Sequence, residues 1–512
     1  MGYLSTAVIG SDALESSADV AHRTGISGYR RLTERLNKFP QGAPPSDTLF
    51  RILSLLLSEH EAALMAQLPL RPFTTETAAR CWGVSPAAAR TILDRFADRA
   101  LLVDSELEGR RLYVFPPPMA GFFEFSMMRV RDDVDQATLA SLLHHYINVE
   151  DEFVTTLFGS GETQIGRALV HEPALDGLLS GNGDRRHRRA DGDGFVRDVS
   201  ALGDGSAADT QLADTIADSA TVLDHELAGE IIRSARYRGV STCFCRHKMH
   251  HLGQACDAPL EICMSFDFVG DSLIRHGHAR EVGVSEALEL LEQAQEAYLL
   301  QFAENVRRSP KFMCHCCSCC CEALVAARRF GFLHPIHTTG FMPVEGPGEC
   351  RACGRCVDVC PIDAIEVVAA PVAGSGCGDA EQASPEGGCR GGEESGAVEQ
   401  TGGAARVRID PDRCLGCGIC VRACPYGVIE LERSDERVLT PLNTTQRLVV
   451  QSIEAGTLPY FVFQQQNELG HRALAAVLGV IVKLPPFKQA LASRQMKSRY
   501  LERLCDRSGW DY

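Results

Sequence analysis

Eight cysteines of this chain occur in two copies of one pattern, C-x2-C-x2-C-x3-C followed by proline. The first copy covers residues 350–361 and the second covers residues 414–425. Within each copy, three closely spaced thiolates let a tight loop wrap one face of a metal cluster. Gly354 and Gly418 allow the backbone to close around that cluster. The fourth cysteine follows three residues later, where we expect a short helix to have begun.

This double motif resembles that of the bacterial two-cluster ferredoxins. The resemblance implies two [4Fe-4S] clusters, with the fourth cysteine of each motif binding the cluster of the other motif. It assigns to the first cluster Cys350, Cys353, Cys356 and Cys424. It assigns to the second cluster Cys414, Cys417, Cys420 and Cys360. A pair of zinc knuckles or disulfides is the alternative for the two motifs.

Ten more cysteines form two groups between residues 243 and 321. They are Cys243, Cys245, Cys256, Cys263, Cys314, Cys316, Cys317, Cys319, Cys320 and Cys321. Thiolates at this density repel one another and oxidise easily unless a metal takes up their charge. If the second group starts a helix, its cysteines fall on two faces, with Cys314, Cys317 and Cys321 on one and Cys316, Cys319 and Cys320 on the other. One cluster cannot use both faces, so either two centres are bound or some thiols have another role.

Three interpretations of this cysteine-rich region remain open. It binds one or two additional iron–sulfur clusters, or structural zinc, or it is a labile metal-sensing or thiol-redox site. Four basic residues beside the first group are either ligands and proton donors or ordinary loop residues, namely Arg246, His247, His250 and His251. His315 is the better candidate ligand because cysteines flank it.

The whole arrangement resembles a set of bacterial proteins described as 4Fe-4S dicluster ferredoxin-type. These proteins carry a Cys-x-Cys-Arg-His segment, a CxCCxCCC segment and a C-terminal ferredoxin. The resemblance covers most of the chain. It implies an architecture and names no reaction.

The fold class that we predict is α+β and multidomain. The predicted units are an N-terminal segment (1–45, loosely packed apart from a short helix near Tyr29–Asn37), a winged-helix-like domain (46–130), a mostly helical region (131–240, with a loop at 180–210), the cysteine-rich metal-binding region (241–345), the two-[4Fe-4S] ferredoxin domain (346–440, with a disordered insertion at 369–405) and a helical tail (441–512). A long helix is predicted at 285–306, with Tyr298 and Phe302 facing the core. Cys377, Cys389 and Cys505 are predicted to be incidental.

Helices followed by a hairpin make residues 46–130 similar to a winged helix. Thr75 and Ser85 are expected to cap two of its helices, and Pro86 to start the second of them. In a DNA-binding interpretation, the helix from Pro86 reads the groove while Arg110 and Arg111 touch phosphate. The exposed face of that helix has mixed charge, so we favour a protein-docking or scaffolding module.

Composition limits the classes of function. The chain has 512 residues, a formal net charge of −16 and 45% hydrophobic residues, which is typical of a globular protein and argues against a nucleic-acid binder as a whole. We see no signal peptide and no apolar run long enough to span a bilayer, so we expect a reducing cytoplasm. No phosphate-binding loop or catalytic triad is evident. The leading hypothesis is electron transfer with a redox partner protein. The alternatives are a redox- or metal-responsive regulator that uses the winged helix, and a reductase with substrate at an open cluster site.

Overall fold

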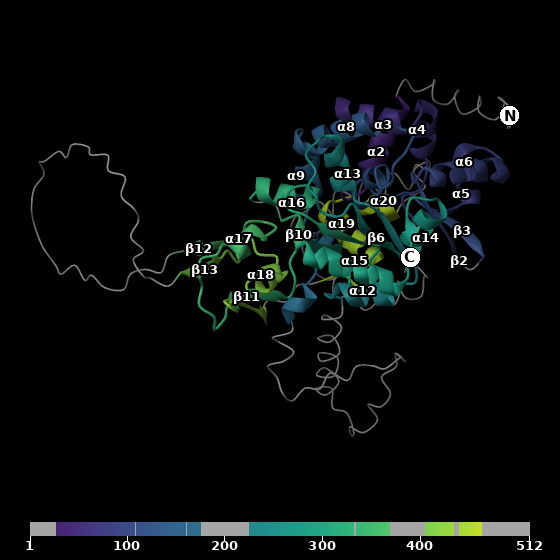
Figure 1. Ribbon diagram of the computed structural model, residues 1–512. Helices are drawn as coiled ribbons and strands as arrows, with labels where there is room; N and C mark the ends of the chain where they lie inside the picture. The colour runs from purple at the N-terminus through teal and green to yellow at the C-terminus, as the bar shows by residue number, and fades with distance from the viewer. Residues whose placement is uncertain are drawn as a thin grey trace, which may run out of the picture.

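The computed structural model describes seven stretches of the chain, which are residues 27–107, 109–159, 161–175, 225–331, 334–368, 405–434 and 440–462. Nearly all of the predicted loop at 180–210 and insertion at 369–405 falls outside these stretches, as do Cys377, Cys389 and Cys505. Figure 1 shows a larger body, in which helices lie on both sides of a sheet, and a small domain beside it.

The first part of the chain folds into helices followed by a three-stranded sheet. The helices are α2 (Gly28–Leu36), α3 (Asp47–Leu56), α4 (Glu59–Met65), α5 (Thr75–Trp82) and α6 (Pro86–Asp98). The strands are β1 (Phe73–Thr74), β2 (Val103–Leu107) and β3 (Arg110–Val114), in the order β1-β3-β2. Ser58 and Glu61 form a capping box on α4, and Ser85 caps α6 directly before Pro86. The predicted hairpin is therefore present.

Two local predictions for this part are wrong. Leu32 and Leu36 of α2 are fully buried, so the described residues from 27 to 45 are well packed, because α2 lies against α4. Thr75 is the first residue of α5 and does not cap it. Thr74 occupies the capping position, and its side chain makes no capping hydrogen bond.

A seven-stranded sheet forms the centre of the body. Its strands are β4 (Gly166–Ala168), β5 (Arg238–Thr242), β6 (Glu261–Phe266), β7 (Arg280–Glu281), β8 (Leu300–Glu304), β9 (Phe312–Cys316) and β10 (Ile336–His337). The order is β10-β4-β8-β9-β6-β5-β7, and all neighbours are antiparallel except β10 and β4. The region 131–240, predicted to be mostly helical, thus also contributes strands to this sheet.

The two faces of this sheet have different coverings. Helices α12 (Ala228–Ser234) and α15 (Val284–Glu296) cover one face through an apolar cluster that includes Met264 and Met313. The other face meets the N-terminal part of the chain, with α8 (Gln136–Asn148), α9 (Glu152–Gly159) and α13 (Phe244–His251) nearby in Figure 1. Side chains alternate along a strand. Cys314 and Cys316 of β9 therefore point to the face opposite Met313.

The long helix predicted at 285–306 is wrong in its second half. The helix α15 ends at Glu296, and the chain then forms β8 in the centre of the sheet. Tyr298 lies in the turn between them with a positive φ of 52°, and it is 40% exposed. The apolar residues that follow fit the helical period by chance, whereas alternation places Phe302 and Ala303 on opposite faces of β8.

A buried carboxylate joins the N-terminal part to the sheet. Asp104 of β2 is fully buried and accepts hydrogen bonds from Ser272 (3.0 Å), Arg275 (3.0 Å) and His276 (2.9 Å) around the helix α14 (Asp267–Arg275). Burial alone would raise the pKa of Asp104, but the hydrogen bonds from His276 and Arg275 outweigh it and hold that pKa well below its usual range. The pKa of His276 is raised in turn by Asp104.

The substitution Asp104→Asn should lower the free energy of unfolding by about 3 kcal/mol, because it removes the buried anion that pairs with the partly exposed Arg275 and His276. The stabilisation by Asp104 is present above its unfolded pKa of about 4 and is lost as pH falls toward the folded pKa. The stabilisation by His276 is present below about pH 6.5 and is lost as pH rises through the raised pKa of His276. Denaturant unfolding at several pH values checks this. Asp132→Asn, on an exposed aspartate, is the control; equal effects of the two substitutions would contradict the prediction.

The small domain and the tail complete the fold. The domain contains the pairs β11 (Phe341–Glu345) with β14 (Ile429–Arg433) and β12 (Ile365–Val368) with β13 (Arg406–Ile409), and the helices α17 (Arg355–Asp358) and α18 (Ile419–Ala423). The tail begins with α19 (Thr444–Glu454) and α20 (Leu458–Val462). Arg447 of α19 forms a buried ion pair with Glu304 of β8 at 2.9 Å, so this part of the tail is tied to the sheet. Among the described helices, none has the length and hydrophobicity of a bilayer span.

Candidate metal centres

The two cysteine motifs of the small domain adopt the same local structure. In each, a loop leads through a glycine into a short helix, from Gly354 into α17 and from Gly418 into α18. These glycines have φ values of 76° and 77°, a conformation that side chains other than glycine rarely adopt. The loops thus close as the motif predicts.

The fourth cysteine of the first motif lies with three cysteines of the second. One cavity is lined by Cys360 together with Cys414, Cys417 and Cys420. Burial raises the pKa of Cys414 to about 11 and that of Cys417 to about 12, with Cys360 adding charge repulsion. Thiolates in this cavity therefore need a positively charged partner, so the donor set fits an iron–sulfur cluster.

Three of the remaining motif cysteines, Cys350, Cys356 and Cys424, lie close to one another. Burial raises the pKa of Cys356, and the nearby Cys424 and Cys350 raise it further. Apolar side chains, among them Ile365 and Val428, pack beside this group. Cys353, the fourth of these cysteines, is exposed to solvent.

The residues that follow the two motifs, among them Ile362, Ala364 and Tyr426, are predicted from the sequence to shield the clusters from water, and Tyr426 does not do so. Tyr426 is 37% exposed, and the guanidinium group of Arg351 lies 4.7 Å from the centre of its ring. The neighbouring positions Ile362 and Ala364 are buried as predicted.

The ten cysteines of the cysteine-rich region fall into two groups, but the predicted helix is wrong. Cys314 and Cys316 lie on β9, a turn follows, and only at Cys321 does the helix α16 (Glu322–Arg329) begin. A Cys-x-Cys pair on a strand presents both sulfur atoms to one face. The sequence predicted that the cysteines divide into two groups. Which cysteines belong to each group follows from the strand β9 and the turn after it.

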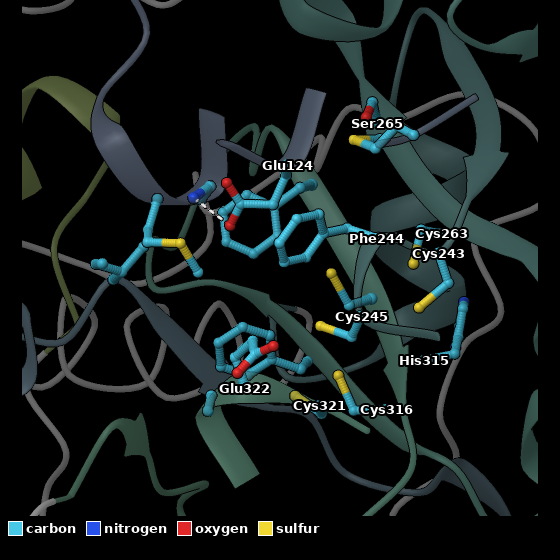
Figure 2. A pocket seen from close by; sticks show the side chains of 18 of the residues that line it. Glu124, Cys243, Phe244, Cys245, Cys263, Ser265, His315, Cys316, Cys321 and Glu322 are labelled. Atoms are coloured by element: carbon cyan, nitrogen blue, oxygen red, sulfur yellow. Dashed lines mark hydrogen bonds between the residues drawn. The ribbon is translucent and has the colours of Figure 1, made fainter. Parts of the chain in front are cut away.

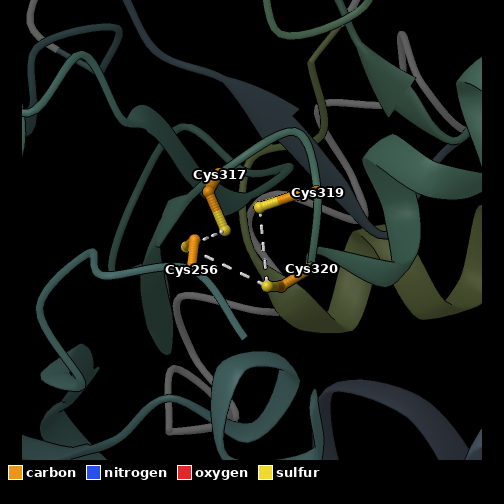
Figure 3. Close-up of side chains that lie close together, drawn as sticks. All are labelled: Cys256, Cys317, Cys319 and Cys320. Atoms are coloured by element: carbon orange, nitrogen blue, oxygen red, sulfur yellow. Dashed lines mark hydrogen bonds between the residues drawn. The ribbon is translucent and has the colours of Figure 1, made fainter. Parts of the chain in front are cut away.

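The first group, which we call the four-thiol site, consists of Cys256, Cys317, Cys319 and Cys320. Their sulfur atoms all lie within 4.8 Å of one another. Figure 3 shows them facing a common centre. The separation is 3.5 Å between Cys256 and Cys317, 3.6 Å between Cys319 and Cys320, and 4.0 Å between Cys320 and Cys256. This compact set offers four sulfur donors to one ion.

The second group, which we call the six-thiol ring, lines a cavity of about 150 Å³ between the sheet and the N-terminal part. Its members in order around the ring are Cys243, Cys245, Cys321, Cys316, Cys314 and Cys263, and each thiol interacts with the two beside it. In Figure 2 the labelled cysteines gather on one side of the cavity, away from Glu124. The strands β6 and β9 and the starts of the helices α13 and α16, from three separate segments, supply the ring.

Ionisation alternates around the six-thiol ring. The S–H groups of its neighbours Cys263 and Cys316 stabilise the thiolate of Cys314 and lower its pKa to about 6. The same effect lowers the pKa of Cys243 and Cys321. The pKa is raised for the three thiols between them, which are Cys245, Cys263 and Cys316. Hydrogen bonds between the neighbouring thiols thus stabilise thiolates in the ring, and a thiolate is the form of cysteine that binds metal.

Two basic residues near the six-thiol ring, Arg246 and His247, interact with backbone carbonyl groups of the protein. Arg246 is buried and hydrogen-bonds the carbonyl groups of Pro259 and His315. His247 contacts the carbonyl oxygen of Met127 at 2.7 Å and His251 at 3.2 Å. The alternation of β9 directs His315 to the face opposite Cys314 and Cys316. The four-thiol site and the ring, as the structure describes them, are built from sulfur alone.

Glu124 is a residue of this cavity that the sequence analysis missed. Its carboxylate accepts hydrogen bonds from the backbone N–H groups of Ala120 (2.7 Å) and Gly121 (3.0 Å). Burial raises its pKa to about 7. A single acidic residue within the apolar run Phe122–Met128 was the signal that could have identified it.

Comparison with known proteins agrees with the geometry of the small domain. Residues 349–428 match the family described as "4Fe-4S dicluster domain". They therefore form a ferredoxin-type domain, which implies two [4Fe-4S] clusters, and this chain carries that 4Fe-4S ferredoxin-type domain.

Individual relatives share only short segments with this chain. It is 36% identical over 76 residues to the pyruvate-flavodoxin oxidoreductase of Rhodospirillum rubrum (15% of this chain, 6% of that protein). It is 33% identical over 96 residues to the polyferredoxin protein MvhB of Methanothermobacter marburgensis (18% and 23%). It is 55% identical over 29 residues to a ferredoxin of Pyrobaculum islandicum (6% and 27%). The chain thus covers about a quarter of the last two relatives and much less of the oxidoreductase. No solved structure matches the chain.

Proposed function

We propose that this protein transfers single electrons between a partner protein and a metal centre in its cysteine-rich region. The ligands of the first ferredoxin cluster are Cys350, Cys353, Cys356 and Cys424, and those of the second are Cys414, Cys417, Cys420 and Cys360. When bound, a [4Fe-4S] cluster supplies a one-electron redox centre. The observation that supports this assignment best is the cavity that Cys360 lines together with three cysteines of the other motif.

The helix α16 links the ferredoxin domain to the six-thiol ring. Its capping residue, Cys321, belongs to the ring. Near its other end, Arg328 forms an ion pair at 2.7 Å with Asp363, three residues after Cys360. An eight-residue helix is about 12 Å long. The ring and the second ferredoxin cluster therefore lie at the two ends of one short, rigid element.

We propose further that the four-thiol site holds a single tetrahedral ion, zinc or iron. Metal–sulfur bonds of about 2.3 Å in a tetrahedron place the sulfur atoms about 3.8 Å apart. The separations of 3.5, 3.6 and 4.0 Å fit that value. Such an ion ties the loop that carries Cys256 to the turn of Cys317–Cys320 and acts as a structural support.

The N-terminal part, in this proposal, is a winged-helix module that contacts protein. On α6, Arg90 pairs with Asp94 at 2.9 Å and Arg99 pairs with Glu61 at 2.8 Å. Arg111, the residue expected to touch phosphate, lies between Asp94 (3.5 Å) and Asp104 (3.4 Å). These ion pairs neutralise the surface that DNA would need, and they favour electron transfer over a DNA-binding regulator. A DNA-binding assay on oxidised and reduced protein separates the two functions.

Stopped-flow reduction tests the electron route. Reduced methyl viologen, a one-electron donor, should reduce the centre in the cysteine-rich region quickly in the wild-type protein. It should do so much more slowly in the double variant Cys353→Ala/Cys414→Ala, because that variant lacks both ferredoxin clusters. Absorbance and electron paramagnetic resonance (EPR) follow each centre. Cys81→Ala, at a cysteine of α5, is the control. Equal rates in the double variant and the wild-type protein would mean that the ferredoxin domain is not on the route.

A further inference from the structure

The six-thiol ring is more open than the four-thiol site. Within the part of the chain that the structure describes, the four-thiol site is the group whose donor atoms all lie within 4.8 Å of one another. The ring contains no trio that meets this criterion, although each of its thiols interacts with two neighbours. A single ion bound by all six sulfur atoms would bring neighbouring sulfur atoms within that limit of 4.8 Å. The ring therefore encloses a larger object than a single ion.

The number of thiols sets a minimum size for that object. A [4Fe-4S] cube offers one terminal position on each iron and takes at most four cysteines. The ring supplies six cysteines. Because each thiol interacts with two neighbours in a closed ring, the six cysteines do not separate into two independent sites. All six side chains also line one cavity of about 150 Å³.

The ligand atoms and charges around the cavity indicate which metal centre the ring binds. The ring offers only sulfur, which favours zinc, copper(I) or iron–sulfur clusters over hard ions. Six thiolates around one or two divalent ions would leave a large negative charge in an apolar cavity. Among the described residues, Arg246 is a cation that lies close to several of these thiols, including Cys243 and Cys263, and Lys311 also lines the cavity. A cluster of many irons and sulfides spreads this charge, so it fits the cavity better than isolated ions.

We propose that the six-thiol ring binds one polynuclear iron–sulfur cluster, larger than a four-iron cube, through Cys243, Cys245, Cys263, Cys314, Cys316 and Cys321. This centre is separate from the two ferredoxin clusters and from the ion of the four-thiol site. It binds whether or not the ferredoxin domain delivers electrons to it. The side of the cavity opposite the cysteines, which carries Glu124 and Phe125, encloses the part of the cluster that the thiols do not cover.

Iron and sulfide analysis of anaerobically prepared wild-type protein, with ⁵⁷Fe Mössbauer spectra, tests the proposal without any substitution. The ferredoxin domain accounts for about eight irons and eight sulfides. The proposal expects more than about four further irons, with sulfide in similar amount. A total of about twelve sulfides or fewer, about thirteen irons or fewer when one iron occupies the four-thiol site, or zinc in place of the additional iron would overturn it.

Two variants assign the additional iron to the ring. Cys263→Ser and Cys314→Ser should each lose the whole additional iron in one step and keep the EPR signals of the ferredoxin clusters, which also report that the chain is folded. Cys319→Ser in the four-thiol site should keep the additional sulfide. A loss of only part of the additional iron in both ring variants would show two independent sites and contradict a single cluster. Loss of electron transfer with the iron unchanged would affect the proposed function alone.

Discussion

Alanine at Cys360 is expected to remove the cluster of the second motif and to spare that of its own motif. The protein should lose about four of the eight ferredoxin irons. The physical reason is the shared cavity, in which Cys360 lies with Cys414, Cys417 and Cys420. Without the fourth thiolate, one iron of the cluster has no protein ligand.

Double variants reveal which cluster Cys360 serves. Cys360→Ala combined with Cys414→Ala should lose no more iron than either substitution alone, because both act on one cluster. Cys360→Ala combined with Cys353→Ala should lose about eight irons, because two clusters are affected. Iron analysis and the EPR spectrum of reduced protein measure these losses. The opposite pattern would assign Cys360 to its own motif.

Serine at Cys256 is expected to release one metal ion and to destabilise the protein. The ion fastens the loop before β6 to the turn after β9, so its loss should cost about 4 kcal/mol and lower Tm by about 10 °C. Metal analysis and thermal unfolding check both effects. The acid-labile sulfide should stay constant, because a mononuclear site contains none.

A matched substitution gives the control for Cys256. Cys81→Ser makes the same chemical change at a half-buried cysteine of α5 that no cysteine group includes. It should retain all metal and lose little stability. A fall in sulfide in the Cys256→Ser variant would show that the four-thiol site belongs to a cluster, and would contradict the assignment of a single ion.

The sequence was informative where local spacing determines geometry. The motif glycines fix the loop, and the resemblance to two-cluster ferredoxins was enough to predict that Cys360 approaches the second motif. The helix at Pro86 was also predictable, since serine followed by proline is a local starting signal. For the motif loops and for the helix at Pro86, residues close in sequence determine the local structure.

Prediction failed where distant segments meet. Cys314, His315 and Cys316 have the two-residue period of a strand, but the density of cysteines hid this pattern behind a helical interpretation. The ring joins Cys243, Cys263 and Cys321 from three segments that only the sheet brings together. Glu124 lies outside the cysteine-rich region altogether. Spacing along the chain therefore indicated the number of cysteine groups, and the tertiary structure determines their members.

The orientation of α16 sets a direction for electron flow in the proposed route. A helix carries partial positive charge at its first turn and partial negative charge at its last. The positive end lies at Cys321 in the ring, and the negative end lies near the ferredoxin domain. Arg328 and Arg329 at that end are both paired with aspartates, so they offset the negative charge only partly. An added electron is thus more stable at the ring than at the ferredoxin end, by about 0.3–1 kcal/mol from this helix. The fold therefore favours electron transfer from the ferredoxin domain, where Cys353 is exposed, to the enclosed six-thiol ring.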